Sequence, residues 1–147
     1  MHIAGPMPKN GPIIVVDDDH EDHLIIQDAF REVLVDQRLI LFDRATDFLE
    51  FLRITVEQPF IIFCDINMPG MNGIEMRNEI VTDPYLREKS IPFVFYSTAA
   101  NPQQIRMAYE LTVQGFFQKP ASYSELVEML RLIVKYWKVS RHPNDYK

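Results

Sequence analysis

Cysteine is nearly absent from this 147-residue sequence, in which Cys64 is the only one. A single cysteine excludes an intrachain disulfide, and its place in an apolar run favours a small core residue over a nucleophile. No apolar run reaches the roughly 18 residues of a membrane span, and residues 1–11 lack the hydrophobic stretch of a signal peptide. We therefore expect a cytoplasmic protein, in a reducing compartment and without a membrane partner.

Basic residues are scarce relative to acidic ones: 15 Lys and Arg stand against 21 Asp and Glu, for a net charge of -6. This balance argues against nucleic acid as a partner and favours cations or basic protein surfaces. The length suits one domain, and 47% hydrophobic residues can build a substantial core. We expect that domain at residues 12–138, between an N-terminal lead, 1–11, and a polar C-terminal tail, 139–147.

Short apolar runs alternate with amphipathic stripes along the chain. The runs predict buried strands at 12–16, 39–42, 60–64, 91–96 and 115–118. Apolar residues at helical spacing predict helices near 20–35, 48–52, 71–81, 102–112 and 123–137, with a long polar connection over 82–90. Five strands that alternate with five helices predict an α/β domain, in which a parallel sheet is covered on both faces.

Residues typical of helix starts support this division. Asn101 followed by Pro102 suits an N-cap and a first helical residue, and Ser122 with Glu125 suits a capping box. Asp19 extends the acidic run after the first strand, where a carboxylate stabilises a helix N-terminus. We therefore interpret Asp19 as an N-cap rather than as a metal ligand.

Polar side chains stand where the predicted strands end, and these are Asp17, Asp18, Asp65, Ser97, Thr98 and Lys119. In an open parallel sheet the carboxyl ends of the strands share one edge, which forms a crevice for ligands. Taken alone, Asp65 could equally begin a surface turn, since Pro69 and Gly70 follow it. The whole set of strand ends favours a site.

The three acids of that set require a cation. Two carboxylates about 4 Å apart repel by roughly 4 kcal/mol at an effective dielectric of about 20. Hard oxygen ligands suit Mg²⁺, which phosphate oxygens often complete. An Asp carboxylate can attack phosphorus while a metal, a lysine and a hydroxyl neutralise the phosphoryl oxygens. The pattern predicts such a site, with Asp65 as the nucleophile and with Lys119 and Ser97 as phosphoryl ligands.

Four separated motifs resemble the receiver domain of two-component response regulators: Val16-Asp17-Asp18, the run DINMPGMNG that begins at Asp65, then Ser97, and Lys119-Pro120. The resemblance spans about residues 12–138. It implies a flavodoxin-like α/β fold, a doubly wound five-stranded parallel sheet with strand order 2-1-3-4-5. It also implies a cis peptide bond between Lys119 and Pro120.

The same resemblance assigns roles to the strand-end residues. It implies that Asp65 is the phosphoacceptor and that Lys119 contacts the phosphoryl group. It implies that Mg²⁺ is held by Asp17, Asp18 and Asp65 and by the backbone carbonyl of Asn67.

Signal output and partners follow from the resemblance as well. Ser97 and Phe116 match the family's switch residues, although Phe116 by itself is typical of a core. The donor would be a sensor histidine kinase or a histidine phosphotransfer protein, and the receiver would act on an unknown downstream protein. A changed surface over residues 102–138 could also support a homodimer. Because only ten residues follow Trp137, we expect a stand-alone receiver of bacterial type.

Three other functions fit part of the pattern. A haloacid-dehalogenase-like phosphatase also uses a strand-end Asp with Mg²⁺, but it needs a general acid two residues later, where this chain has Asn67. A flavodoxin-like binder would place a ligand phosphate against three acids. A degenerate receiver, acting as a constitutive interaction module, would lack groups that are present here. We therefore expect a phosphoacceptor and not an enzyme.

Overall fold

A five-stranded parallel sheet forms the centre of the protein, in a computed structural model that describes residues 11–147. The expected N-terminal lead therefore lies, apart from Gly11, outside the described residues. The strand order is β2-β1-β3-β4-β5, which confirms the predicted doubly wound, flavodoxin-like α/β fold. The strands are β1 (Ile13–Val16), β2 (Leu39–Phe42), β3 (Ile61–Cys64), β4 (Phe93–Ser97) and β5 (Gly115–Gln118).

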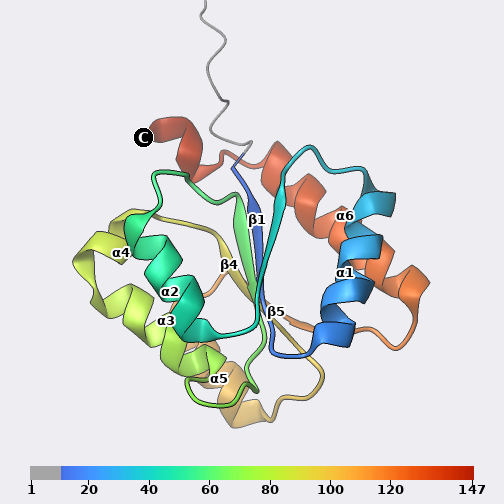
Figure 1. Ribbon diagram of the computed structural model, residues 1–147, viewed down its shortest axis with the longest axis horizontal. Helices are drawn as coiled ribbons and strands as arrows, with labels where there is room; N and C mark the ends of the chain where they lie inside the picture. Colours follow the sequence, from blue (N-terminus) through green and yellow to red (C-terminus); the bar gives the residue numbers. More distant parts are fainter. Residues whose placement is uncertain (1–10) are drawn as a thin grey trace, which may run out of the picture.

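Helices cover both faces of this sheet. They are α1 (His20–Val33), α2 (Ala45–Ile54), α3 (Gly73–Thr82), α4 (Pro84–Glu88), α5 (Pro102–Glu110) and α6 (Tyr123–Val139). In Figure 1, α1 and α6 lie on one side of the sheet and α2 to α5 on the other. The predicted polar connection over 82–90 is wrong, because it contains α4. The Asp83 side chain caps α4 by accepting from the N–H groups of Tyr85 and Leu86, and Leu86 is buried.

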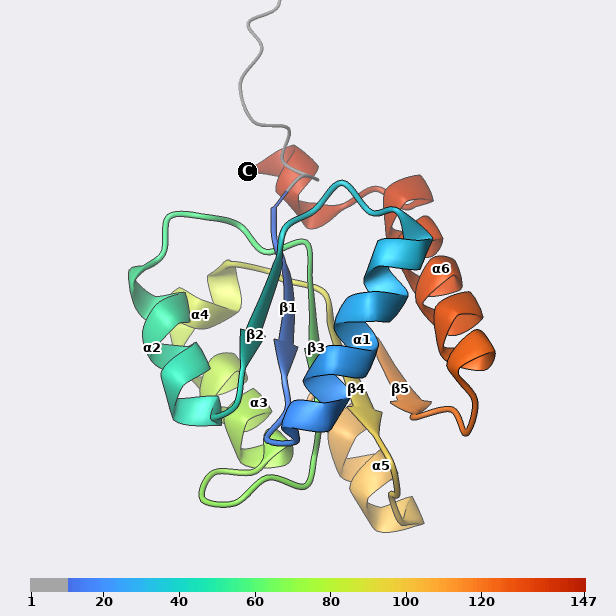
Figure 2. The ribbon, with the colours of Figure 1, turned by 45° about the vertical axis from the view of Figure 1, so that its right-hand side comes forward.

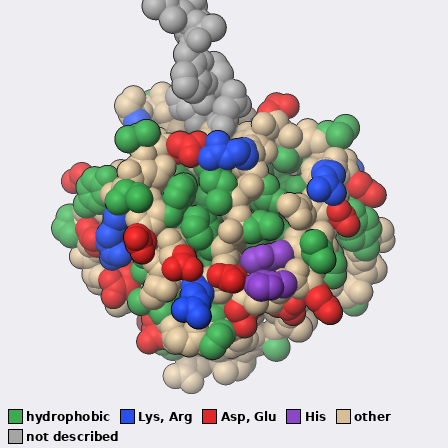
Figure 3. Space-filling model, in the orientation of Figure 1, with side chains coloured by type: hydrophobic (Ala, Val, Ile, Leu, Met, Phe, Trp, Pro, Cys, Tyr) green, Lys and Arg blue, Asp and Glu red, His purple; other side chains and the backbone are tan. Residues whose placement is uncertain are grey.

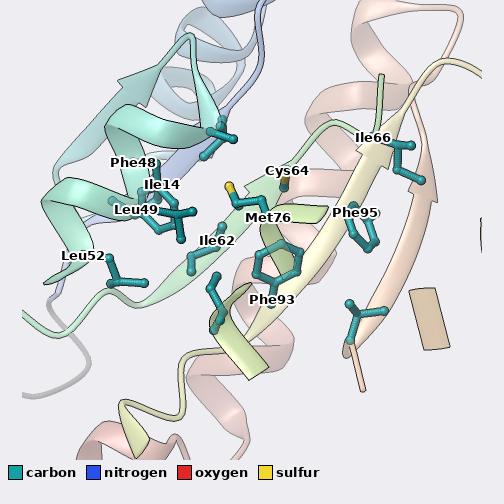
Figure 4. Packing of buried hydrophobic residues seen from close by; sticks show 14 of the residues in the cluster. Ile14, Phe48, Leu49, Leu52, Ile62, Cys64, Ile66, Met76, Phe93 and Phe95 are labelled. Atoms are coloured by element: carbon teal, nitrogen blue, oxygen red, sulfur yellow. The ribbon is translucent and has the colours of Figure 1, made fainter. Parts of the chain in front are cut away.

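Alternate residues of the strands build two separate cores. Ile13 and Val15 of β1 face the layer of α1 and α6, and Ile14 and Val16 face the opposite layer. Figure 4 shows the second core, where Ile14 and Ile62 lie among the side chains of α2 and α3. Strands buried on both faces explain why the sequence shows continuous apolar runs rather than alternation.

The N-caps expected from the sequence are present. The Asp19 side chain accepts from the N–H groups of Glu21 and Asp22, which confirms it as the cap of α1. Asn101 caps α5, and Ser122 caps α6 by accepting from the N–H of Glu125. These caps fix where each helix begins, directly after the carboxyl edge of the sheet.

The C-terminal segment differs from the polar tail that the sequence suggests. It folds into a 3-10 helix, Pro143–Tyr146, and His142 is fully buried. The His142 ring stacks on Phe60 at 5.0 Å, and its Nε2 donates to the Phe60 carbonyl oxygen at 2.7 Å. Asn144 donates to the carbonyl oxygen of Gln58 at 3.1 Å. Backbone carbonyls before β3 thus satisfy these polar groups, at the sheet edge opposite to the strand ends (Figure 2).

Candidate functional site at the carboxyl edge of the sheet

The strand register brings the predicted site residues together. Val16 pairs with Cys64, so the following residues, Asp17 and Asp65, come side by side. The N–H of Asp65 donates to the Val16 carbonyl at 2.9 Å, which continues the ladder one residue past the strand. On the other side, the N–H of Lys119 donates to the Ser97 carbonyl at 2.9 Å. The four residues therefore project from one edge, as the sequence predicted.

Three carboxylates cluster at this edge. One oxygen from each of Asp17, Asp18 and Asp65 lies within 4.8 Å of the other two. Asp17 and Asp65 are buried, at 1% and 8% exposure, and Asp18 is exposed. Burial raises the pKa of Asp17, and the hydrogen bonds that it accepts from Lys119 and from the Asp19 N–H offset this only in part. Asp17 therefore lies in an environment that disfavours its ionised form.

Lys119 is the cation of the site. Its Nζ lies 2.7 Å from Asp17 Oδ2, 2.7 Å from Asp22 Oδ2 and 3.4 Å from Asp65 Oδ2. Burial lowers the pKa of Lys119, but the hydrogen bonds to Asp17 and Asp22 more than reverse this, so the net pKa is raised. The ammonium stays charged at every physiological pH.

The peptide bond between Lys119 and Pro120 is trans, as is every other peptide bond in residues 11–147. The expectation of a cis bond is therefore wrong for this structure. A trans bond is the usual state before proline. From this backbone the Lys119 side chain reaches Asp17, Asp22 and Asp65.

Asp22 is a site residue that the sequence analysis missed. It lies on the first turn of α1, and its side chain is 29% exposed. Its place three residues after the N-cap Asp19 puts it at the N-terminal end of α1, next to the strand-end acids. Acidic residues in a first helical turn are ordinary, however, and this signal alone does not point to Lys119.

The Ser97 hydroxyl is already turned toward the site. Its Oγ donates to Asp65 Oδ1 at 2.8 Å, and the backbone N–H of Asn67 approaches the same oxygen at 3.4 Å. The Asn67 side chain donates to the Ala99 carbonyl at 3.4 Å. Asp65 is thus held from two sides, by a hydroxyl and by Lys119.

A cavity of about 390 Å³ lies behind Ser97. Phe116 lines it together with Ser97, Ala100 and Ile105. Phe116 is half-buried, and its ring lies 5.8 Å from that of Phe95. The two predicted switch residues therefore border one space.

Gly73 and Cys64 hold the backbone next to Asp65. A Cβ on Gly73 would lie 2.2 Å from the Asp65 carbonyl oxygen, so only glycine allows α3 to begin this close. Cys64 is fully buried in the core, and burial raises the pKa of its thiol. This fits the predicted core role and does not suit a nucleophile.

Histidines accompany the acids on the surface near α1. Figure 3 shows histidine side chains beside carboxylates on this face. His20 Nε2 lies 3.2 Å from Asp43 Oδ2, and His23 Nε2 lies 2.5 Å from the Asp17 carbonyl oxygen. His23 therefore supports the backbone of an acidic residue of the site.

The donor set fits a divalent cation. Asp17, Asp18 and Asp65 supply carboxylate oxygens close to one another, and such hard ligands suit Mg²⁺ or Mn²⁺. Burial raises the pKa of Asp17 despite its hydrogen bond from Lys119, so additional positive charge beside this carboxylate would stabilise its ionised form. A cation held here would supply positive charge beside Asp65.

The fold and the site define an α/β protein with an acidic cluster, at the carboxyl edge of its sheet, that fits a divalent cation. Residues 13–131 match the family model of the response regulator receiver domain, and the chain belongs to this family. Response regulator Rcp1 of Synechocystis is 28% identical over 130 residues, which are 85% of this chain and 87% of Rcp1. Chemotaxis protein CheY-3 of Vibrio cholerae is 30% identical over 123 residues, 83% of this chain and 90% of CheY-3.

Solved structures agree with this assignment. The phosphorylated cyanobacterial phytochrome response regulator RcpA superposes with a TM-score of 0.81 at 28% identity, over 91% of this chain and 99% of RcpA. The Mn²⁺-bound form of Rcp1 gives a TM-score of 0.78 at 26% identity, over 90% of this chain and 99% of Rcp1.

The protein is therefore a receiver of two-component signal transduction, a class that accepts a phosphoryl group, binds a divalent metal and has a phosphodonor partner such as a kinase. Receivers are generally phosphoacceptors without an enzymatic activity of their own. Within residues 11–147, no helix has the length and apolar character needed to cross a membrane.

Proposed function

We propose that Asp65 accepts the phosphoryl group and that Asp17, Asp18 and Asp65 hold Mg²⁺. The observation that carries this proposal is the surroundings of the Asp65 carboxylate. Ser97 Oγ lies 2.8 Å from one of its oxygens and Lys119 Nζ lies 3.4 Å from the other. A carboxylate that lies between a hydroxyl, an ammonium and two further acids suits a nucleophile that needs a cation.

In the transfer step, an Asp65 oxygen attacks phosphorus, and an O–P bond forms while the bond to the donor breaks. With a phosphohistidine donor, the imidazole nitrogen leaves with the electron pair of the N–P bond. Lys119 and the Ser97 hydroxyl then donate to phosphoryl oxygens, and a cation held by the acids would offset their negative charge. The Asn67 backbone carbonyl is proposed as a further metal ligand, because Asn67 matches the residue that has this role in receiver domains.

The donor is proposed to be a sensor histidine kinase or a histidine phosphotransfer protein. We place the protein in the cytoplasm with such a donor, in keeping with the free and buried Cys64 thiol. No hydrolysis of phosphate esters is proposed, since Asn67 cannot act as a general acid.

Phosphorylation by acetyl phosphate tests the acceptor. Intact-mass spectrometry should show one phosphoryl adduct that requires Mg²⁺ and is absent from Asp65→Asn. Asp47→Asn is a matched control, because Asp47 is an exposed acid of α2. An undiminished adduct in Asp65→Asn would refute the proposal. Mg²⁺-dependent multiple turnover of p-nitrophenyl phosphate would instead indicate a phosphatase.

Output is proposed to leave through the surface of α5, β5 and α6, roughly residues 102–138. The Ser97 hydroxyl already faces Asp65, so it needs only to pass from the carboxylate to a phosphoryl oxygen. The cavity of about 390 Å³ gives Phe116 room to move in response. The coupling is a population shift, limited by the difference in contacts between the two states. A downstream protein or a second copy of the chain would recognise the changed surface.

NMR spectra with and without beryllofluoride, a phosphoryl analogue, test this route. We expect shifts at Phe116 and along α6 as well as around Asp65. Ser97→Ala should still be phosphorylated but should show weaker distant shifts. Shifts confined to the surroundings of Asp65 would contradict the route.

A further inference from the structure

We propose that Asp22 is a positioning residue that holds Lys119 in the resting site and releases it when Asp65 is phosphorylated. The proposal rests on the function proposed for Asp65. Asp22 would then weaken the interaction of Lys119 with the phosphoryl group, although it lies outside the cluster of Asp17, Asp18 and Asp65.

The distances around the ammonium carry this inference. Lys119 Nζ has three N–H donors, and its two short bonds, both 2.7 Å, go to Asp17 and Asp22. The contact with Asp65 Oδ2 is longer, at 3.4 Å. In the resting state the phosphoacceptor is therefore the weakest of the three partners of Lys119. A phosphoryl oxygen on Asp65 that draws the ammonium closer therefore competes with the two shorter bonds, to Asp17 and Asp22.

Asp22 is the partner that can leave. Asp17 belongs to the carboxylate cluster that fits a cation, and its side chain is 2% exposed. Asp22 lies outside that cluster, is 29% exposed, and lines a cavity of about 640 Å³ together with Lys119 and Glu125. Its carboxylate can turn to water in this space without an uncompensated buried charge. A phosphoryl group carries about -1.5 to -2 charges and would also repel Asp22.

The test is beryllofluoride affinity at saturating Mg²⁺, measured by NMR titration. Asp22→Asn should bind beryllofluoride about two- to fivefold more tightly than the wild type, the range for loss of a partly exposed ion pair. Asp22→Ala should do the same, and Asp22→Glu should restore wild-type affinity. Glu21→Gln is the matched control, because Glu21 is an exposed acid on the same turn whose side chain, within residues 11–147, takes part in no ion pair.

Three results would overturn either the role proposed for Asp22 or the function proposed for Asp65. Beryllofluoride affinity in Asp22→Asn that equals that of Glu21→Gln, or is weaker, would overturn the role of Asp22. Loss of Mg²⁺ affinity in Asp22→Asn alone, measured without beryllofluoride, would make Asp22 a metal ligand and overturn it as well. The function proposed for Asp65 would instead be refuted if the wild-type protein bound no beryllofluoride, or bound it with the same affinity as Asp65→Asn.

Discussion

Lys119→Met should destabilise the metal-free protein, because the lysine neutralises a buried acid cluster. Its Nζ contacts three carboxylates, and its side chain is only 9% exposed. Removing one partner of a buried ion pair destabilises a protein by about 3 to 5 kcal/mol. Because Asp22 is partly exposed, we expect the lower value, about 3 kcal/mol in the free energy of unfolding. For a domain of this size the melting temperature would fall by about 6 to 12 °C.

Mg²⁺ should restore much of the stability that Lys119→Met loses. A ligand at one hundred times its Kd stabilises a native state by about 2.7 kcal/mol. The gain should be larger in Lys119→Met than in the wild type at the same Mg²⁺ concentration, because the ammonium no longer repels the metal. Urea unfolding near neutral pH, followed by circular dichroism, measures both quantities. The experiment with EDTA gives the stability without metal, and the experiment with Mg²⁺ gives the gain from the metal.

Lys135→Met is the control, since Lys135 is an exposed lysine of α6. It should change neither the stability without metal nor the gain from Mg²⁺. Two results would refute the reasoning: a metal-free Lys119→Met as stable as Lys135→Met, or a Mg²⁺ gain no larger than that of the wild type.

Two further substitutions probe the same edge. Gly73→Ala should destabilise the protein by about 1 to 3 kcal/mol and weaken Mg²⁺ binding in calorimetry, because the new Cβ would press on the Asp65 backbone; unchanged Mg²⁺ affinity would contradict this. Asp17→Asn should stabilise the metal-free protein near pH 7, since a native pKa above the unfolded value makes the ionised carboxyl unfavourable. This gain should decrease as the pH falls through the raised native pKa and vanish below about 3.9, where both states hold the proton. A pH-independent difference would exclude the explanation.

The position of the site could be predicted from the sequence because of one geometric fact. Parallel strands end at a common edge, so residues after separate apolar runs must come together. Asp17, Asp65, Ser97 and Lys119 needed no knowledge of side-chain packing to be placed there. Asp17 and Asp65 each follow a strand that is buried throughout, and Ser97 ends another, so the strand ends are sharp in the sequence.

Other features depend on packing that no local pattern encodes. His142 lies in a polar stretch, and its burial depends on the ring and the carbonyl oxygen of Phe60, 82 residues earlier in the chain. Helix α4 is a single short helix whose one buried anchor, Leu86, gives no periodicity. The pairing of Asp22 with Lys119 joins residues 97 positions apart. The resemblance implied a cis peptide bond between Lys119 and Pro120, whereas this bond is trans in the structure.

The opposite signs expected for Lys119→Met and Asp17→Asn have a common origin. The edge carries more acids than its lysine can neutralise, so losing the cation is harmful and losing a buried acid is favourable. The same excess of negative charge favours binding of a divalent cation. The metal would supply the positive charge that the fold lacks, and its binding would stabilise the native state. While the site is at rest, Lys119 lies closer to Asp17 and Asp22 than to Asp65. Charge delivered to Asp65 must then compete for the ammonium, and that competition can make the response depend on phosphorylation rather than on the metal alone.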